Sequence, residues 1–124
     1  MELNYNITRL ITAKSSEVAK YTPMQLKEAI LKSEGRVIMG QTYLNNPILI
    51  NGCTSTELMF AFGADMVLLN GFDFFHPADC PGMQGFDYQE LKDLVGGRPV
   101  GIYLGCPKEG LDFNNQENSQ LYDL

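Results

Sequence analysis

Three short apolar segments, spaced by about 30 residues, are the feature of this sequence that most restricts its fold. They lie at residues 37–39, 66–69 and 99–104. Apolar runs that do not alternate with polar residues are typical of strands buried on both faces of a parallel sheet. Parallel strands need long crossovers, and a helix pattern separates each pair of segments. The order helix, strand, helix, strand, helix, strand predicts an α/β fold of parallel βαβαβ units with right-handed crossovers.

Each predicted helix begins with a capping pattern, in which a Thr or Asp is followed three residues later by Gln or Glu. Glycines that can adopt a left-handed conformation then end the helices. The capping pairs are Thr22 with Gln25, Thr54 with Glu57 and Asp87 with Glu90, and the terminating glycines are Gly35, Gly63 and Gly96.

Apolar spacing predicts what two of these helices bury. The helix over residues 55–62 is apolar on almost every side, so we expect it to be buried. In the helix that follows Asp87, we expect Leu91, Leu94 and Val95 to face inward.

The number of strands is small for a complete domain of this class. A closed (β/α)8 barrel takes about 250 residues, and a small flavodoxin-like sheet has about five strands, whereas the 124 residues here supply three or four strands. We therefore expect a partial (β/α)8 (TIM) barrel over residues 23–106. Residues 1–22 form an N-terminal lead-in, and residues 107–124 form a polar C-terminal tail that is a candidate truncation point. Unpaired strand edges predict self-association into a homo-oligomer.

Charge and hydropathy exclude two classes of partner. The formal net charge is -6 and no local basic cluster offsets it, which argues against binding to nucleic acid or to an anionic membrane surface. The longest apolar runs are far shorter than the ~20 residues of a membrane span, and the N-terminus lacks the apolar core of a signal peptide. We expect a cytoplasmic protein.

Cysteine usage agrees with a reducing compartment. Cys53, Cys80 and Cys106 are odd in number and form no CxxC pair, so no disulfide framework is predicted. A closed zinc site would need all three thiolates together with the single histidine, His76, from distant loops. We interpret the cysteines as free, unreactive thiols.

Three stretches of sequence together resemble a known family. They are residues 26–38, 51–73 and 97–104, and their most specific phrases are Ser33–Arg36 and Phe62–Asp73. They resemble the N-terminal part of bacterial phosphoenolpyruvate phosphonomutase-like proteins, distant relatives of the phosphoenolpyruvate mutase and isocitrate lyase superfamily. The resemblance covers most of residues 7–106 and implies a (β/α)8 barrel. It also implies a magnesium ion (Mg2+) that binds an oxo-acid or enolpyruvate, held by carboxylates at the carboxyl ends of strands.

Two departures from that superfamily's pattern are visible. The later strands of the barrel have no counterpart in this sequence, and its dense carboxylate signature is not recognisable. Asp73, just beyond a predicted strand end, matches part of that signature.

Functional side chains of a parallel sheet gather at the carboxyl ends of its strands. At that edge we expect Gln41, Thr42 and Tyr43 after the first predicted strand, Asn70 after the second and Tyr103 near the end of the third. We predict that Gln41, Thr42, Asn70 and Tyr103 bind a small-molecule substrate.

Asp73 and His76 are the catalytic candidates, in a loop over residues 71–86. The Asp73 carboxylate can ligate magnesium or accept a proton, or it can cap the loop by accepting backbone amides. His76 can act as a general acid or base near neutral pH, or be a partly exposed packing residue. The length of the loop and its Phe72, Phe74 and Phe75 suggest an apolar lid.

Two hypotheses about function follow. The first, implied by the resemblance, is a magnesium-dependent lyase or mutase of the phosphoenolpyruvate phosphonomutase-like kind, incomplete in this chain, that makes or breaks a C–C or P–C bond in a small oxo-acid or phosphonate. The second is a non-catalytic, truncated barrel segment that is ordered by self-association. No glycine-rich stretch forms a nucleotide-binding fingerprint.

Overall fold

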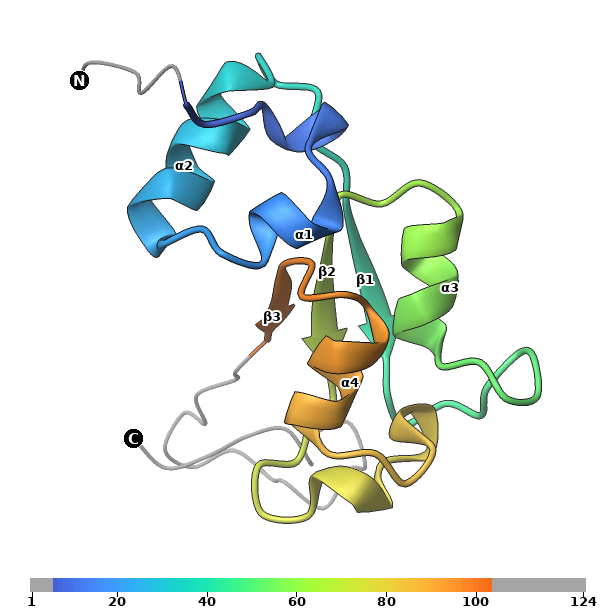
Figure 1. Cartoon of the computed structure of the whole chain (residues 1–124). Coiled ribbons are helices and arrows are strands. Elements are labelled where there is room, and N and C mark those ends of the chain that lie inside the picture. Colours follow the sequence, from blue (N-terminus) through green and yellow to red (C-terminus); the bar gives the residue numbers. More distant parts are fainter. Residues whose placement is uncertain (1–5, 104–124) are drawn as a thin grey trace, which may run out of the picture.

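The computed structural model describes residues 6–103, whose main helices and strands alternate in the predicted order (Figure 1). The predicted tail at 107–124, with the last residues of the predicted domain and Cys106, lies outside the described residues. No helix within residues 6–103 is long and apolar enough to cross a membrane. The elements are η1 (Leu10–Thr12), α1 (Ser15–Val18), α2 (Pro23–Lys32), β1 (Met39–Tyr43), α3 (Ser55–Ala61), β2 (Met66–Asn70), η2 (Pro77–Asp79), η3 (Pro81–Met83), α4 (Tyr88–Leu94) and β3 (Val100–Ile102), where η denotes a 3-10 turn.

The predicted helix caps form as the sequence indicates. The Thr22 hydroxyl accepts a hydrogen bond from the backbone N–H of Gln25, whose side chain accepts one from the N–H of Thr22. Thr54 and Glu57 make the same reciprocal pair at α3, and the Asp87 carboxylate caps α4. Such a cap is worth about 1 kcal/mol, so local sequence fixes where these three helices begin.

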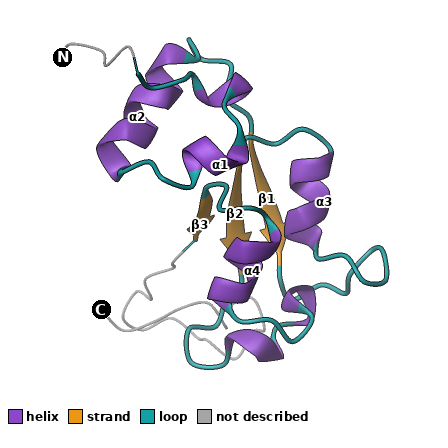
Figure 2. Cartoon of the chain, in the orientation of Figure 1, coloured by secondary structure: helices purple, strands orange, loops and turns teal. Residues whose placement is uncertain are grey.

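The three strands form one parallel sheet in the order β1-β2-β3, drawn in orange in Figure 2. Met39–Tyr43 pairs residue by residue with Met66–Asn70, and Val67–Leu69 pairs with Val100–Ile102. Each crossover connection therefore places the next strand on the same side of the strand before it, from β1 to β2 and from β2 to β3. Right-handed crossovers in one direction place both connecting helices on the same face of the sheet.

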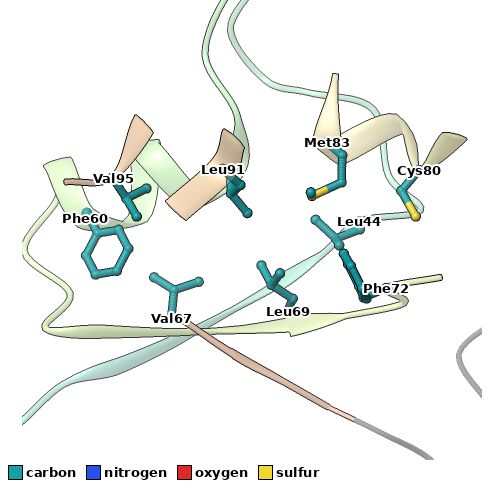
Figure 3. Packing of buried hydrophobic residues seen from close by; sticks show 9 residues of the cluster. All are labelled: Leu44, Phe60, Val67, Leu69, Phe72, Cys80, Met83, Leu91 and Val95. Carbon is teal, nitrogen blue, oxygen red and sulfur yellow. The ribbon is translucent and has the colours of Figure 1, made fainter. Parts of the chain in front are cut away.

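The main core lies between that face and helices α3 and α4. In Figure 3 the side chains of Val67 and Leu69 on β2 point toward Phe60 of α3 and toward Leu91 and Val95 of α4. Full burial of such a side chain contributes roughly 1.5–3 kcal/mol, so this layer holds the sheet to its helices. The cluster is completed by Leu44, Phe72, Cys80 and Met83.

A second, smaller core lies near the N-terminal ends of the strands, where Figure 1 shows α1 and α2. Ile7, Leu10 and Val18 pack against Ala29 of α2. The Lys32 ammonium donates a hydrogen bond to the Ile7 carbonyl over 2.7 Å. The N-terminal segment therefore packs on α2, away from the carboxyl ends of the strands.

The face of the sheet opposite α3 and α4 carries several exposed side chains. Thr42 of β1 pairs with Leu69 and is buried, so alternation along the strand turns its neighbours to the other side. Met39 and Tyr43 are each 57% exposed on that side, and Gln41 is exposed as well. We call this side the open face, formed by Met39, Gln41, Tyr43, Leu68 and Gly101.

The first strand begins later than predicted. It runs from Met39 to Tyr43 and excludes residues 37 and 38, because the N–H of Ile38 donates to the Asp65 carboxylate over 2.9 Å. Gln41 and Tyr43 thus lie within the strand and not after it.

Two expectations about burial are wrong. Helix α3 is not buried all round, since Phe62 at its C-terminal end is 86% exposed. Leu94 is exposed, whereas Leu91 and Val95 are buried as predicted. Both errors have one physical cause: a sheet of three strands covers only one stripe of each helix, so the outer flank stays uncovered by the described residues.

Candidate functional site

The carboxyl ends of the strands are covered by residues 71–87, the yellow segment that Figure 1 shows below the arrowheads. The N–H of Gly82 donates to the Leu44 carbonyl over 2.8 Å, just after β1. A Cβ at Gly82 would lie 2.9 Å from the Leu44 Cα, so only glycine allows this approach. The Gln84 amide also donates to the Cys53 carbonyl over 3.1 Å. These contacts dock the loop on the end of β1.

The three phenylalanines of the loop do not act alike. Phe72 is buried and meets Phe74 and Tyr88 edge to face, with ring centroids 5.1 and 5.9 Å away. Phe74 is half exposed and Phe75 more so. Phe72 therefore anchors the loop, and only Phe74 and Phe75 are placed to cover a ligand at the surface.

Asp73 accepts hydrogen bonds from the backbone of its own loop. One carboxylate oxygen, Oδ1, accepts hydrogen bonds from the N–H of Phe75 over 2.9 Å and from the N–H of His76 over 3.3 Å. This is the capping role that the sequence left open. The second oxygen, Oδ2, lies 3.7 Å from Nδ1 of His76. One oxygen of Asp73 is thus committed to the loop, and the other faces the imidazole.

His76 is a surface residue. Its side chain is 69% exposed, and its contact with Asp73 is an ion pair only when the imidazole is protonated. An exposed pair of this kind contributes little to stability. The structure brings the two predicted catalytic residues together, three positions apart on one turn.

The predicted substrate-binding residues divide between the two faces of the sheet. Gln41 lies on the open face, and so does Asn70, which is buried and pairs with Tyr43 in the register. Tyr103 donates its backbone N–H to the Leu69 carbonyl, which extends β3 by one residue and turns its side chain to the open face. Tyr43, Asn70 and Tyr103 therefore form one row across the carboxyl end of the open face.

Thr42 lies on the other face, under α3. It is 4% exposed, and its hydroxyl has no hydrogen-bond partner among the described residues. The sheet itself separates Thr42 from the row of Tyr43, Asn70 and Tyr103, so these candidates do not form one site.

Residues 6–103 supply few metal ligands at this edge. They contain no group of three or more His, Cys, Asp and Glu side chains that could hold a metal ion. Magnesium is often bound through one or two carboxylates together with water and substrate. Asp73 can therefore provide one such carboxylate.

The described cysteines are free, as predicted. Cys80 is buried below the loop, and its thiol donates to the Gly71 carbonyl over 3.6 Å. Burial raises the pKa of the Cys80 thiol above its usual value, and the nearby carboxylates of Asp73 and Asp79 raise this pKa further. A thiol that resists ionisation is a poor nucleophile.

An apolar pocket beside β1 was missed by reasoning from sequence. It has a volume of about 350 Å³ and lies between β1, the loop after it and α3. No charged residue within residues 6–103 lines it. The signal that identifies it is a set of apolar side chains left exposed on one flank, notably Leu49 and Phe62, at 82% and 86% exposure. Its lining is Thr42, Tyr43, Asn46, Pro47, Leu49, Ser55, Leu58, Met59 and Phe62.

Comparison with known proteins finds one family. The family model described as a domain of unknown function (DUF7916) matches residues 11–122. No curated protein and no solved structure matches the chain significantly. Because the match spans most of the sequence, the chain belongs to the DUF7916 family.

Proposed function

We propose that this chain forms part of a (β/α)8-type enzyme of the phosphoenolpyruvate phosphonomutase-like kind. The substrate is a small oxo-acid or phosphonate bound at the carboxyl end of the sheet. The chemistry requires strands beyond the three described here.

The direction of winding is the observation that supports this proposal. The strand order β1-β2-β3 follows the chain, and α3 and α4 pack on one face. A barrel winds in one direction with its helices outside, and the three described strands follow this pattern, as one half of a doubly wound sheet also does. The open face then corresponds to the interior of the barrel.

The row of Tyr43, Asn70 and Tyr103 on the open face supports a substrate-binding site at this end of the sheet. The hydroxyls of Tyr43 and Tyr103 and the amide of Asn70 are uncharged groups that donate hydrogen bonds to carboxylate or phosphonate oxygens. Asp73 follows Asn70 by three residues, at the same end of β2. A magnesium ion held there would supply the positive charge that such a substrate attracts.

Thermal unfolding with added magnesium chloride, pyruvate and methylphosphonate tests the proposal. A ligand present at ten times its Kd stabilises the folded state by about 1.4 kcal/mol. Asp73→Asn is the informative variant, because an amide oxygen can still accept the two backbone hydrogen bonds while the charge is lost. We expect Asp73→Asn to keep the basal stability and to lose the stabilisation by magnesium.

Asp73→Ala is the matched control, since it removes the backbone contacts and the charge together. A magnesium effect that survives in both variants would exclude Asp73 as a ligand. If magnesium chloride, pyruvate and methylphosphonate all leave the thermal stability of the wild-type chain unchanged, the proposed binding activity is wrong for this polypeptide.

The second candidate function is the non-catalytic one, in which the chain is a barrel segment ordered by self-association. The observation in its favour is the exposure of Met39 and Tyr43 on the open face and of Phe62 at the end of α3, together with the apolar pocket that Tyr43 and Phe62 line. Apolar patches of this kind mark interaction surfaces. It predicts a midpoint of urea unfolding that rises with protein concentration and does not respond to magnesium.

A further inference from the structure

We propose that the free edge of β1, where no other described strand pairs with it, joins the same edge of a second copy, antiparallel and around a two-fold axis, to give a continuous sheet across two chains. The inference rests on the second candidate function, self-association, and names the surface that carries it. It is an alternative to barrel closure, because in a closed barrel this edge of β1 pairs with another strand of the same barrel.

The backbone of β1 has one hydrogen-bonding side turned away from β2. The N–H of Leu44 donates to the Asn70 carbonyl, and the Ile38 carbonyl accepts from the N–H of Met66. In a parallel pair, alternate residues bond to the neighbouring strand, so the even-numbered residues of β1 face β2. The N–H and C=O groups of Met39, Gln41 and Tyr43 therefore point to the free edge.

This edge lacks the devices that keep an edge strand from pairing. Residues 39–43 contain no charged residue and no proline, and β1 carries no bulge against β2. Natural edge strands commonly carry lysine, proline or a bulge for protection. The described residues that line the pocket beside the edge are also all uncharged. In a chain of net charge -6, this is a surface where two identical copies meet without like-charge repulsion.

The other edge of the sheet is less available. Val67 donates its N–H to the Pro99 carbonyl, and Tyr103 donates to Leu69. The odd-numbered residues of this segment thus face β2, and Val100 faces outward. The outward carbonyl of Val100 already accepts a hydrogen bond from the Tyr88 hydroxyl over 2.9 Å. On the β1 edge the outward carbonyl of Tyr43 likewise accepts a hydrogen bond, from the N–H of Asn46 over 3.2 Å. The difference between the edges is length, since β1 has five residues and β3 has three. The longer edge favours pairing of β1 with β1 over a head-to-tail arrangement of β3 with β1.

The apolar area beside the edge approaches what a dimer needs. Met39, Tyr43, Leu49 and Phe62 are between 57% and 86% exposed. At about 150–250 Å² for a large side chain, they offer roughly 500 Å² per copy. A standard interface buries about 800 Å² per partner, and the edge backbone and the pocket lining can supply the difference.

One register pairs all three outward-facing residues. In it the Tyr43 carbonyl, which already accepts a hydrogen bond from the N–H of Asn46 over 3.2 Å, uses its second lone pair to accept one from the second copy. It places Gln41 opposite Gln41 of the second copy on the two-fold axis, and Met39 opposite Tyr43. In this arrangement the α3 helices of the two copies lie on the same side of the joined sheet. The exposed Phe62 of each copy is then near the pocket of the other.

Sedimentation equilibrium on the full chain tests the proposal with a pair of charge variants. Gln41→Lys and Gln41→Glu each put two like charges face to face on the axis. We expect the wild-type chain to be a dimer, and each variant alone to weaken dimerisation at least tenfold. An equimolar mixture of the two variants should regain the dimer, because opposite charges then meet. Gln89→Lys, the same change on the exposed side of α4, is the control and should dimerise like wild type.

The outcomes separate this interface from self-association in general. If the wild-type chain associates but Gln41→Lys associates equally well, the β1 interface is wrong and another surface carries the assembly. If both variants dissociate but their mixture does not recover, the two-fold pairing at Gln41 is wrong. If the wild-type chain is monomeric at every concentration, both the interface and the proposed self-association are overturned.

Discussion

Leu68 and Leu69 are adjacent on β2 and differ in the face of the sheet that they occupy. Leu69 is completely buried under α3 and α4, whereas Leu68 is partly exposed on the open face between Gln41 and Gly101. The same truncation at the two positions therefore compares the two faces directly.

Leu69→Ala should cost about 3–4 kcal/mol. The lost methyl and methylene groups are worth about 0.8 kcal/mol each on transfer from water, and the cavity they leave adds to that cost. Leu68→Ala removes a side chain that is already partly hydrated, and so should cost about 1 kcal/mol. We expect a difference of about 2–3 kcal/mol between these variants in the free energy of unfolding.

Urea unfolding followed by far-UV circular dichroism measures this difference, at a protein concentration low enough to keep the chain monomeric. Equal slopes with urea for both variants and wild type would show that the change lies in stability and not in compactness. Equal losses at the two positions, or a larger loss for Leu68→Ala, would mean that the open face is covered, and would refute the assignment of the two faces.

Three further predictions concern the loop and the β3 edge. Tyr88→Phe removes the hydrogen bond to the Val100 carbonyl and should cost about 1 kcal/mol. Burial raises the pKa of Tyr88 above 10.0. The tyrosine of the unfolded chain therefore ionises at a lower pH than that of the folded chain, and the wild type loses stability as the pH rises past 10.0. Urea unfolding measured below and above this pH should show a smaller loss of stability for Tyr88→Phe than for the wild type. Cys80, which is buried, should resist alkylation by iodoacetamide in the native chain and react on unfolding, as peptide mass spectrometry would show; rapid native labelling would place the thiol at the surface. Gly82→Ala forces a Cβ against the Leu44 backbone and should lower the stability by about 1–3 kcal/mol; an unchanged urea midpoint would mean that the loop is not docked there.

Local signals in the sequence predict the helices well, because their causes lie within one turn. Thr22 with Gln25, and Thr54 with Glu57, form the predicted capping pairs. The buried strand at Met66–Asn70 likewise follows from its composition.

Local signals could not predict which face of the sheet each side chain of β1 occupies. Gln41 and Thr42 are adjacent polar residues, and the sequence does not show which of them is buried. The choice depends on α3, since Gly40 makes room for Met59, whose sulfur would lie 2.8 Å from a Cβ there. That contact joins residues far apart in the chain.

The candidate site shows the same limit. The position of Asp73 at the end of β2 follows from the strand pattern, but its commitment to two backbone N–H groups depends on how the loop turns. The docking of Gln84 on the Cys53 carbonyl joins residues 31 positions apart and has no local signal. The pocket beside β1 arises in the same way, from three segments that the fold brings together.

Amide hydrogen exchange along β1, measured by NMR, tests the free edge most directly. At protein concentrations where the chain is monomeric, the amides of Gly40 and Thr42 should be protected by β2, and those of Met39 and Gln41 should exchange rapidly. At high concentration the latter two should become protected as the second copy pairs with them. Protection of Met39 and Gln41 in the dilute monomer would show that the edge is already paired within the chain, and would contradict the account.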